Sequence, residues 1–498
     1  MLYGQRHHFG GVLERTEPFS WTAPGAPWIN HEIGAEWVMA LAHLWGGSRG
    51  LWILMILVGA ATLTLAGWEA ATRVSRGHRW LVWAIIALSS REVALGFAMR
   101  PQIFSALAWI LLLVSLRYLG AGRRWPVAAI PLLCILWINT HGGVLLAVVV
   151  LVVLVGATLV VVAVRRHARC AAVLARWTSE VGWDTWSWSA YGATAVLAAG
   201  ALFANPYGWR LPAWLIGSVA YTRPEISEWN PTSLDATHAI FWLLALAWVW
   251  ALMQRRARVP GWEAIVGTLL LVAAARHERH VPLFALTMIA FLPGCVSRWM
   301  DGRHVPKVSA PALSLIAVLL GGTAALGVSR IVTGAAVSGP LGGRMQVSTE
   351  EYPVGAIRFV RAAGIKGNAV IYFDWAQQAL WELPDSSVSF DGRLDTCYPR
   401  ALIAEHWDFF HRGVLPARTF SLHDADWMLL PRGSEAVAAL GSVPSWRRAY
   451  MDTVAEVFVN TDRGAVPESI WGAKPGSLGD VVAFPDQVPG RADELRRR

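Results

Sequence analysis

The chain alternates apolar segments with polar loops, and nearly every arginine of these loops falls on every second loop. About 20 apolar residues are needed to cross the hydrocarbon core of a bilayer, so the pattern predicts a protein that crosses a membrane many times. Ten predominantly apolar segments can be drawn, at residues 50–72, 80–98, 102–118, 126–139, 143–164, 189–204, 237–253, 261–275, 280–297 and 309–328. The shorter segments are expected to extend beyond these bounds.

The positions of the arginines predict the orientation. The basic loops lie at residues 73–79, 117–124, 165–176, 255–258 and 298–307. Lys and Arg concentrate in cytoplasmic loops of membrane proteins, so these loops are predicted to be cytoplasmic. The first 49 residues and everything after about residue 330 are then predicted to lie outside, which agrees with an even number of spans.

Composition narrows the classes of function. The chain has 498 residues, of which 55% are hydrophobic and 15% charged, as expected for a membrane domain with one appended soluble domain. The net charge of +9 comes largely from the loop arginines and does not indicate a nucleic-acid partner, since no basic patch with interleaved aromatics lies elsewhere. The four cysteines predict neither a disulfide framework nor a metal site.

Tryptophan is unusually frequent, with 29 residues, many near predicted span ends, such as Trp80, Trp125, Trp209 and Trp262. Anchoring at the membrane surface explains most of them, and sugar stacking by a few is the alternative. No signal peptide opens the chain. Because residues 1–49 are still predicted outside, we expect an upstream in-frame helix. Alternatively, segment 50–72 itself starts translocation of a short tail.

Polar residues of the membrane domain gather at the outer ends of the spans. Ionisable groups near membrane depth are costly, so each is a candidate functional residue. They are Arg91, Glu92, Arg100, Gln102, Asn139, His141, Asn205, Arg210, Glu225, Glu228, Asn230, Arg276, His277, Glu278, Arg279 and His280. Structural alternatives are pairing of Arg91 and Glu92 with each other's neighbours to satisfy buried helices, turn chemistry around His141 and Asn205, and a solvated turn at 276–280.

The N-terminal outer segment forms a second group of candidates. Residues 16–32 interleave acids with Trp, Phe and Pro, as expected for a loop at a membrane surface. The apolar residues between Ile33 and Leu44 then fall on one helical face that ends at Gly46-Gly47, which predicts a short surface helix with Asn30 as its N-cap. Glu32 either favours the helix dipole or acts as a general base.

Several motifs of the chain resemble those of a known family. They are TEPFSWTAPGAPWINHEIGAEW at 16–37, RPQIFS at 100–105, WINTHGG at 137–143, NPYGWR at 205–210, EWNP at 228–231, RHERHVPLFAL at 276–286, and YFDWAQQALWELP and SFDGRLDTCYPR in the C-terminal region. In this order they resemble bacterial integral-membrane glycosyltransferases of the GT-C superfamily, and more narrowly its large, mostly uncharacterised bacterial group.

The resemblance implies a mainly α fold, in which a polytopic helical membrane domain of the GT-C type carries a small C-terminal α/β domain outside the membrane. It also implies a transferase in the cytoplasmic membrane that takes a sugar from a polyprenyl-phosphate donor on the outer leaflet. The acceptor would be a glycan, lipid or protein of the envelope. Some similar enzymes use a divalent metal, although no ligand spacing in this chain requires one.

Candidate roles follow from the matched motifs. Similar enzymes place an acid of the first outer loop near the acceptor as general base, and the acids available here are Glu17, Glu32 and Glu36, with His31 beside them. The candidate phosphate contacts are Arg100, Arg210, Arg276 and Arg279, because a guanidinium binds phosphate oxygens bidentately and stays charged. The remaining substrate-binding candidates are Gln102, Asn139, His141, Asn205, Glu228, Glu278 and His280. Members of the group usually carry an aspartate motif ahead of the segment that matches Glu17-Pro18-Phe19-Ser20, and this chain starts after that point.

The region from residue 345 to 475 changes character and predicts the outer α/β domain. Short strands are expected at 369–373, 388–390, 427–430 and 454–459, with helices at 353–363 and 398–411. The charges Asp374, Asp391, Arg393 and Asp395 at or just beyond strand ends are either binding groups or solvated loop charges. Residues 476–498 are predicted to be a disordered tail.

Three functions remain open at this point. The first is the lipid-linked sugar transferase, with an enzyme of the O-antigen-ligase kind as its neighbour. The second is a non-catalytic protein that binds polyprenyl lipids or organises an envelope assembly. The third is a transporter or flippase, which should show internal repeats and charges near the midplane of the membrane.

Overall fold

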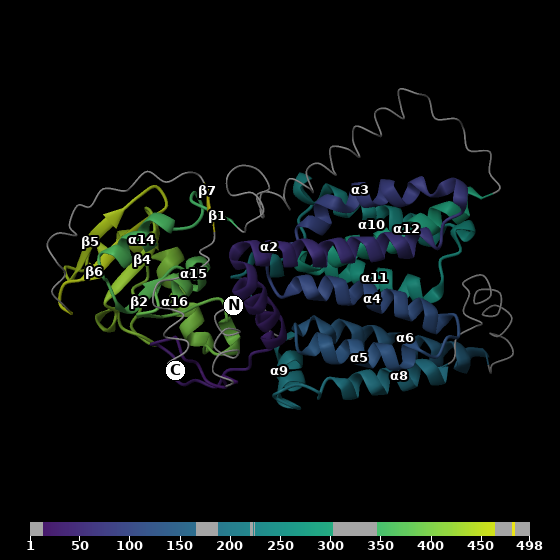
Figure 1. Cartoon of the computed structure of the whole chain (residues 1–498), viewed down its shortest axis with the longest axis horizontal. Helices are drawn as coiled ribbons and strands as arrows, with labels where there is room; N and C mark the ends of the chain where they lie inside the picture. The colour runs from purple at the N-terminus through teal and green to yellow at the C-terminus, as the bar shows by residue number, and fades with distance from the viewer. Residues whose placement is uncertain are drawn as a thin grey trace, which may run out of the picture. The chain divides into compact units, whose positions relative to one another are not determined.

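The computed structural model describes residues 13–165, 188–219, 223, 225–301, 346–463 and 481–483. The chain divides into two compact units (Figure 1). The helical unit comprises Trp52–Ala335, and the sheet domain combines Met1–Leu51 with Ala336–Arg498. The N-terminal segment, predicted to be an outer loop of its own, therefore belongs to the same unit as the C-terminal domain.

Nine described helices of the membrane region correspond to nine of the ten predicted segments, eight of them to within a few residues, whereas the first begins at Ile33 and not at residue 50. They are α2 (Ile33–Ala71), α3 (Trp80–Ala94), α4 (Gln102–Gly120), α5 (Pro126–Ile138), α6 (Leu145–Arg165), α8 (Trp188–Ala201), α10 (Ala239–Met253), α11 (Gly261–Arg276) and α12 (Val281–Met300), with the additional short α9 (Arg210–Val219). The tenth predicted segment, 309–328, lies outside the described residues.

Five of the described helical segments are long and apolar enough to cross a membrane. They are Ile33–Ala71, Gln102–Gly120, Gly142–Ala163, Ala236–Met253 and Glu278–Met300. The others are shorter than the roughly 20 residues that a bilayer core requires, so the predicted number of ten transmembrane helices is not confirmed. A mainly helical protein with several membrane-spanning helices is supported.

Helix α12 is the central helix of the helical unit. It packs against α3, α4, α10 and α11, and Phe284 and Phe291 on it are fully buried. The indole N–H of Trp109 on α4 donates to Thr287 Oγ1 at 2.8 Å. Two neighbouring helices also approach closely, because a Cβ on Gly267 of α11 would lie 2.4 Å from the Trp248 ring of α10. Figure 1 shows these helices running side by side.

The basic loop ends of this unit carry buried ion pairs. Arg73 contacts both Glu69 and Glu263, and Arg117 Nε lies 2.9 Å from Glu69 Oε1. These contacts join the end of α2 to α4 and α11, so some arginines of the predicted cytoplasmic loops also hold helices together. Among the tryptophans predicted to anchor at the membrane surface, Trp80, Trp125 and Trp209 are exposed. Trp262 instead lies buried, with its ring 5.3 Å from that of Phe291.

The predicted surface helix and the first apolar segment form one element, α2, that is broken at Gly47. This residue has φ 56° and ψ −143°, a conformation open to glycine. Past the break, a Cβ on Gly50 would lie 1.9 Å from the carbonyl oxygen of Ala42. Asn30 Oδ1 accepts a hydrogen bond from Glu32 N at 3.0 Å just before the helix begins. The predicted end of the surface helix agrees with this geometry, whereas Asn30, predicted as its N-cap, makes a turn two residues ahead of the residue that precedes the helix.

The sheet domain has a five-stranded sheet in the order β3-β2-β4-β6-β5. Strands β2 (Gly367–Ile371), β3 (Ser386–Val388) and β4 (Trp427–Pro431) are parallel, and β5 (Trp446–Met451) and β6 (Ala455–Asn460) are antiparallel to their neighbours. Its helices are α14 (Val354–Ala362), α15 (Phe373–Glu382), α16 (Arg400–Arg412) and α17 (Glu435–Leu440). Helices α14 and α16 lie close to the two predicted helices, whereas α15 and α17 were not predicted. Strand β1 (Gln346–Ser348) pairs with β7 (Val481–Ala483), a described part of the region predicted to be disordered.

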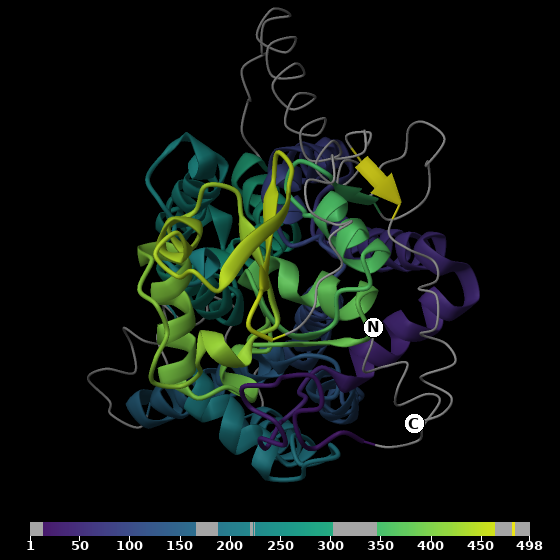
Figure 2. The same ribbon diagram turned by 90° about the vertical axis from the view of Figure 1, so that its left-hand side faces the viewer.

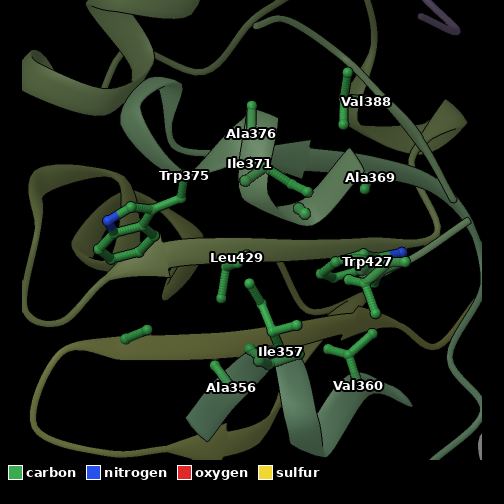
Figure 3. Packing of buried hydrophobic residues seen from close by; sticks show 14 of the residues in the cluster. Ala356, Ile357, Val360, Ala369, Ile371, Trp375, Ala376, Val388, Trp427 and Leu429 are labelled. Carbon is green, nitrogen blue, oxygen red and sulfur yellow. The ribbon is translucent and has the colours of Figure 1, made fainter. Parts of the chain in front are cut away.

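Both faces of this sheet are buried, because alternate strand residues point to opposite faces. On one face, Ile371 and Leu429 pack with Ile357 of α14 and Ala376 of α15 (Figure 3). On the other, Val370 and Met428 pack with helices α16 and α17, and with Ala23 and Trp28 from the N-terminal segment. Figure 2 looks onto this domain, with the N-terminal segment in purple and the β5–β6 hairpin in yellow.

The N-terminal segment pairs with the edge of the sheet. Ser20 forms a parallel bridge with Val388 of β3, in which Val388 N donates to Phe19 O at 3.0 Å and Trp21 N donates to Val388 O at 3.1 Å. The Trp21 indole also donates to Ala369 O at 3.0 Å. Residues near 20 and near 388 therefore lie on the same side of any membrane that the helical unit crosses. The chain between them must then cross that membrane an even number of times.

A buried histidine makes the stability of the sheet domain depend on pH. His406 on α16 packs its ring 4.6 Å from Phe410 and 4.8 Å from Phe390, and burial lowers the pKa of His406 to about 3. The unfolded chain, with a pKa of about 6.5, takes up a proton first as the pH falls. The stabilising effect of the neutral ring is therefore complete above about pH 6.5 and is lost toward pH 3.

We expect a shift from pH 8 to pH 5 to lower the free energy of unfolding of this domain by about 2 kcal/mol through His406 alone. His406→Leu should remove this part of the pH dependence. Thermal melts of both proteins at the two pH values measure it, and other titrating groups cancel in the difference. Equal pH dependence in both proteins would contradict the prediction.

Candidate functional site

The longest predicted outer loop docks on the turn between α11 and α12. His277 Nδ1 lies 2.6 Å from Trp229 O, Glu278 N donates to Asn230 O at 3.0 Å, and Thr232 N donates to Ala275 O at 3.2 Å. The EWNP and RHERH motifs, which were singled out separately in the sequence, therefore lie together at one end of the helical unit. We call residues 223, 228–232 and 276–280 the outer-loop cluster.

Two arginines of the outer-loop cluster approach the same indole ring. The guanidinium carbons of Arg223 and Arg279 lie 4.5 Å and 4.4 Å from the centre of the Trp229 ring, and the ring of His277 meets the indole edge-on at 5.7 Å. Arg223 is held by Ser218, through the carbonyl oxygen at 3.1 Å and the hydroxyl at 2.5 Å. Both guanidinium groups thus lie against one indole ring, so this end of the helical unit carries fixed positive charge.

A chain of ionisable side chains lies at the same end of the unit. His238 Nε2 lies 3.3 Å from Glu278 Oε1, and His238 Nδ1 lies 3.8 Å from Glu92 Oε2. Arg91 pairs with Glu92 at 2.8 Å and also donates to the carbonyl oxygen of Thr237. Arg91 and Glu92 thus pair with each other, and each also lies against a residue of the turn before α10.

The other arginines of this end are more exposed. Arg100 Nη1 lies 3.8 Å from Glu228 Oε2, with the Arg100 side chain 62% exposed. Arg276 ends α11 and Arg210 begins α9, and both are exposed. Gln102 begins α4 and is half-buried. The ring of His280 lies 6.2 Å from that of His277.

Three of the predicted substrate-binding residues make structural contacts. Asn139 donates to the carbonyl oxygens of Ile135 and Ala204, both at 2.8 Å. Asn205 donates to Leu202 O at 2.7 Å and Gly208 O at 2.9 Å, and accepts from Tyr207 N at 2.8 Å.

His141 Nδ1 accepts from Gly143 N at 3.0 Å and lies 2.7 Å from Ser105 Oγ. The turn chemistry that the sequence offered as the alternative for His141 and Asn205 is therefore what the structure contains.

The predicted acids of the N-terminal segment lie in the sheet domain. Glu36 accepts a hydrogen bond from Asn30 Nδ2 at 2.6 Å. Glu32 Oε1 lies 3.6 Å from His31 Nε2, and both side chains are partly exposed. Of the three candidate bases, Glu32 is therefore the one that pairs with a predicted neighbour and remains open to solvent.

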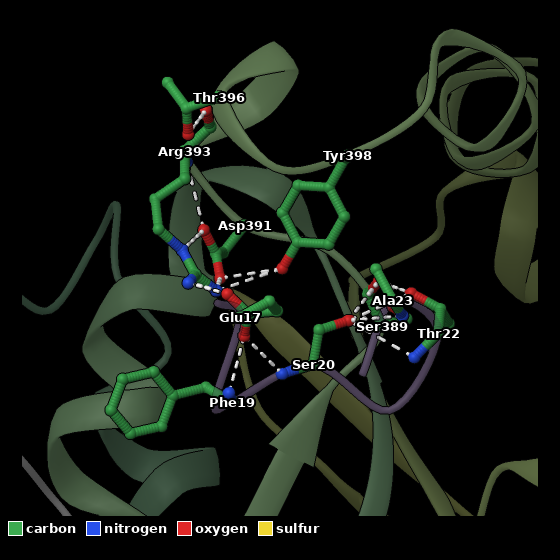
Figure 4. A network of polar contacts seen from close by, with 10 residues as sticks. All are labelled: Glu17, Phe19, Ser20, Thr22, Ala23, Ser389, Asp391, Arg393, Thr396 and Tyr398. Atoms are coloured by element: carbon green, nitrogen blue, oxygen red, sulfur yellow. Dashed lines mark hydrogen bonds and ion pairs between the residues drawn. The ribbon is translucent and has the colours of Figure 1, made fainter. Parts of the chain in front are cut away.

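Glu17 lies in a buried network with Arg393 (Figure 4). Its Oε1 accepts from Phe19 N at 2.5 Å and Ser20 N at 2.6 Å, and its Oε2 is paired with Arg393. Arg393 also binds Asp391 bidentately, through Nε at 2.8 Å and Nη2 at 2.5 Å. A carboxylate with these partners is held in place and hidden from substrate, which argues against Glu17 as a general base.

The same network holds more negative than positive charge. Glu17 and Asp391 share the single guanidinium of Arg393, and the Tyr398 hydroxyl donates to Asp391 Oδ2 at 3.0 Å. Burial raises the pKa of Asp391 to about 6, although its hydrogen bonds act in the opposite direction. Of the charges predicted at strand ends, Asp391 and Arg393 are thus buried partners of the N-terminal segment.

Within the part of the chain that the structure describes, no group of three or more His, Cys, Asp or Glu side chains is arranged to hold a metal ion. Sequence reasoning missed the site roles of Arg223, Trp229 and His238. Trp229 lies within the EWNP motif and Arg223 five residues before it, whereas His238 carried no local signal, since its partners lie at positions 92 and 278. The chain matches no protein-family model and none of the curated proteins with which it was compared.

Proposed function

We propose that the protein is a membrane glycosyltransferase of the GT-C type, which moves a sugar from a polyprenyl-phosphate donor to an envelope acceptor on the outer face of the cytoplasmic membrane. The observation that carries the proposal is the approach of Arg223 and Arg279 to Trp229 at the end of the helical unit predicted to face outward. This arrangement provides fixed positive charge beside an aromatic surface, which suits a phosphate-linked sugar.

The chemistry requires such a site. When the sugar leaves a polyprenyl-phosphate donor, the phosphate gains negative charge, and preorganised cations lower the free energy of that transition state. Arg279 and Arg223 are candidates for this role, with Arg276 and Arg100 as exposed cations that attract the donor. The Trp229 ring, which both guanidinium groups approach, would help to hold them in place.

The topology argument is consistent with this proposal. The positive-inside rule places the arginine-rich loop ends in the cytoplasm, and the opposite ends of α3, α11 and α12 then face outward. The shared sheet domain requires an even number of crossings between its two parts. The proposal of ten transmembrane helices satisfies this parity, and it places the sheet domain outside.

The test is sugar transfer by the purified full chain from a panel of polyprenyl-phosphate sugars. We expect turnover by the wild-type protein and a loss of about 100-fold in kcat/KM for Arg279→Ala, comparable to the loss of one transition-state hydrogen-bond donor. The matched control is Arg256→Ala, an exposed arginine beyond the other end of α11. It should keep wild-type activity.

Two outcomes would favour the alternatives. Binding of polyprenyl phosphate without any turnover would support a non-catalytic lipid-binding or assembly protein. Movement of the intact lipid-linked sugar across vesicle membranes, without transfer, would support a flippase. Equal activity of Arg279→Ala and the wild-type protein would remove the cluster around Trp229 from the proposed site.

A further inference from the structure

Glu278, His238 and Glu92 form a continuous chain of ionisable groups from three separate elements. Glu278 lies in the 3-10 turn Glu278–His280, His238 ends the 3-10 turn Ala236–His238, and Glu92 lies in the last turn of α3. The distances are 3.3 Å from Glu278 Oε1 to His238 Nε2 and 3.8 Å from His238 Nδ1 to Glu92 Oε2. Because the three residues are far apart in sequence, only the packing of the helical unit brings them together.

The exposed fraction of the side chain falls from Glu278 through His238 to Glu92. The side chain of Glu278 is 36% exposed, that of His238 is 3% exposed, and that of Glu92 is fully buried. A purely structural ion pair would not require its outermost carboxylate to remain open to solvent. Here the carboxylate of Glu278 is open to solvent, and the imidazole of His238 lies on its buried side.

We infer that Glu278 is the general base that deprotonates the acceptor hydroxyl, and that His238 is the positioning residue that holds its carboxylate. This inference rests on the proposed transferase function and assigns a residue that the sequence had placed among the substrate contacts. Glu92, paired with Arg91, lies on the other side of the imidazole, with its Oε2 3.8 Å from His238 Nδ1. A base whose orientation is set by a second, buried group is a recurring arrangement in enzymes.

In the proposed step, one proton moves to Glu278 and the sugar moves to the acceptor. The acceptor oxygen forms a bond to the anomeric carbon while its proton passes to a carboxylate oxygen of Glu278. The bond between the anomeric carbon and the phosphate oxygen breaks, and its electron pair leaves with polyprenyl phosphate. Arg279 follows Glu278 in the same turn, so the base and the cation that receives the leaving phosphate are supplied by one short segment.

Charged groups from several elements lie at the same end of the helical unit as Glu278. They are Arg91 and Glu92 on α3, His238 before α10, Glu228 in the 3-10 turn Ser227–Trp229, and the sequence neighbours Arg276, His277, Arg279 and His280. A pH profile of the rate reports on this whole group of charges.

The first experiment compares the wild-type protein with Glu278→Gln, which keeps the side-chain shape. We expect kcat to fall by at least about 100-fold, the usual contribution of a general base, with little change in binding of polyprenyl phosphate. In Glu278→Ala, sodium formate should restore part of the rate, because a small carboxylate can replace the missing base. Asp301→Asn is the matched control and should keep wild-type activity, because Asp301 is a carboxylate that also lies beside a histidine, His78 at 3.5 Å, but at the other end of α12.

The second experiment tests the positioning role of His238. His238→Ala should lower kcat about 10-fold and move the acid limb of the pH profile, while KM for the donor stays within about threefold. His238→Gln, which can still donate a hydrogen bond to Glu278, should recover part of the rate. An unmoved pH profile in His238→Ala would overturn the positioning role.

The outcomes separate this inference from the proposal on which it depends. If the wild-type protein transfers sugar and Glu278→Gln does so at the same rate, only the assignment of Glu278 is wrong. If the wild-type protein binds polyprenyl phosphate but transfers no sugar from any donor, both the transferase proposal and this assignment are wrong.

Discussion

Replacing Arg393 with alanine should lower the free energy of unfolding of the sheet domain by about 3–5 kcal/mol, because it leaves buried carboxylates without their cation. Glu17 and Asp391 both pair with this guanidinium, and neither side chain is more than 1% exposed. Denaturation of the purified full chain, followed by hydrogen exchange of the backbone amides of β2 and β4, measures the effect. A change of less than about 1 kcal/mol would contradict the prediction.

Two further variants test whether the loss of stability in Arg393→Ala comes from the unpaired buried charges. Arg412→Ala removes an exposed arginine that pairs with Asp408 at 3.0 Å on the same domain, and surface pairs of this kind contribute at most about 1 kcal/mol. Combining Arg393→Met with Glu17→Gln and Asp391→Asn removes the buried charges together. It should recover much of the lost stability, since replacing a whole buried ion pair costs far less than breaking it.

Trp28→Ala should destabilise the same domain by about 3–5 kcal/mol, the usual range for removing a large buried aromatic side chain. Trp28 is 4% exposed and belongs to the core that covers one face of the sheet. Its ring also lies 5.3 Å from the guanidinium carbon of Arg393. Trp28 belongs to the N-terminal segment. A loss of stability in Trp28→Ala would therefore show that this segment is part of the folded domain.

Limited proteolysis of the full chain gives a second measurement for Trp28→Ala. We expect faster cleavage both within residues 13–32 and within the C-terminal part of the domain, because the two fold together. Trp45→Ala is the control, since Trp45 is 86% exposed and its removal should change neither the melting temperature nor the cleavage rate. Faster cleavage confined to residues 13–32 would mean that the C-terminal part is stable without the segment.

The sequence predicted most of the secondary structure because hydropathy and its period depend on neighbouring residues. The helices from α3 to α12 begin and end close to the predicted apolar segments, and β2, β4 and β6 lie near the predicted strands. Gly46-Gly47 also marked the break in α2, since Gly47 adopts a conformation that other residues rarely adopt. The membrane orientation remains a prediction from the arginine pattern.

The candidate site was predictable only in part. The sequence placed the polar groups at one end of the helices, and the docking of residues 228–232 on residues 276–280 agrees with that grouping. It could not separate binding residues from structural ones. Asn139, His141 and Asn205 carry the right chemistry for binding, yet their hydrogen-bonding groups are used within turns and helix ends.

The sequence by itself therefore determined the helical and strand segments, the predicted orientation and the end of the helical unit at which polar groups gather. The tertiary structure decided the partners: Arg393 for Glu17, which lies 376 positions away, and His238 for Glu92 and Glu278. The physical reason is that local hydropathy selects an element whatever its distant neighbours are. An ion pair instead depends on the path of the whole chain, which brings distant side chains within a few ångströms of each other.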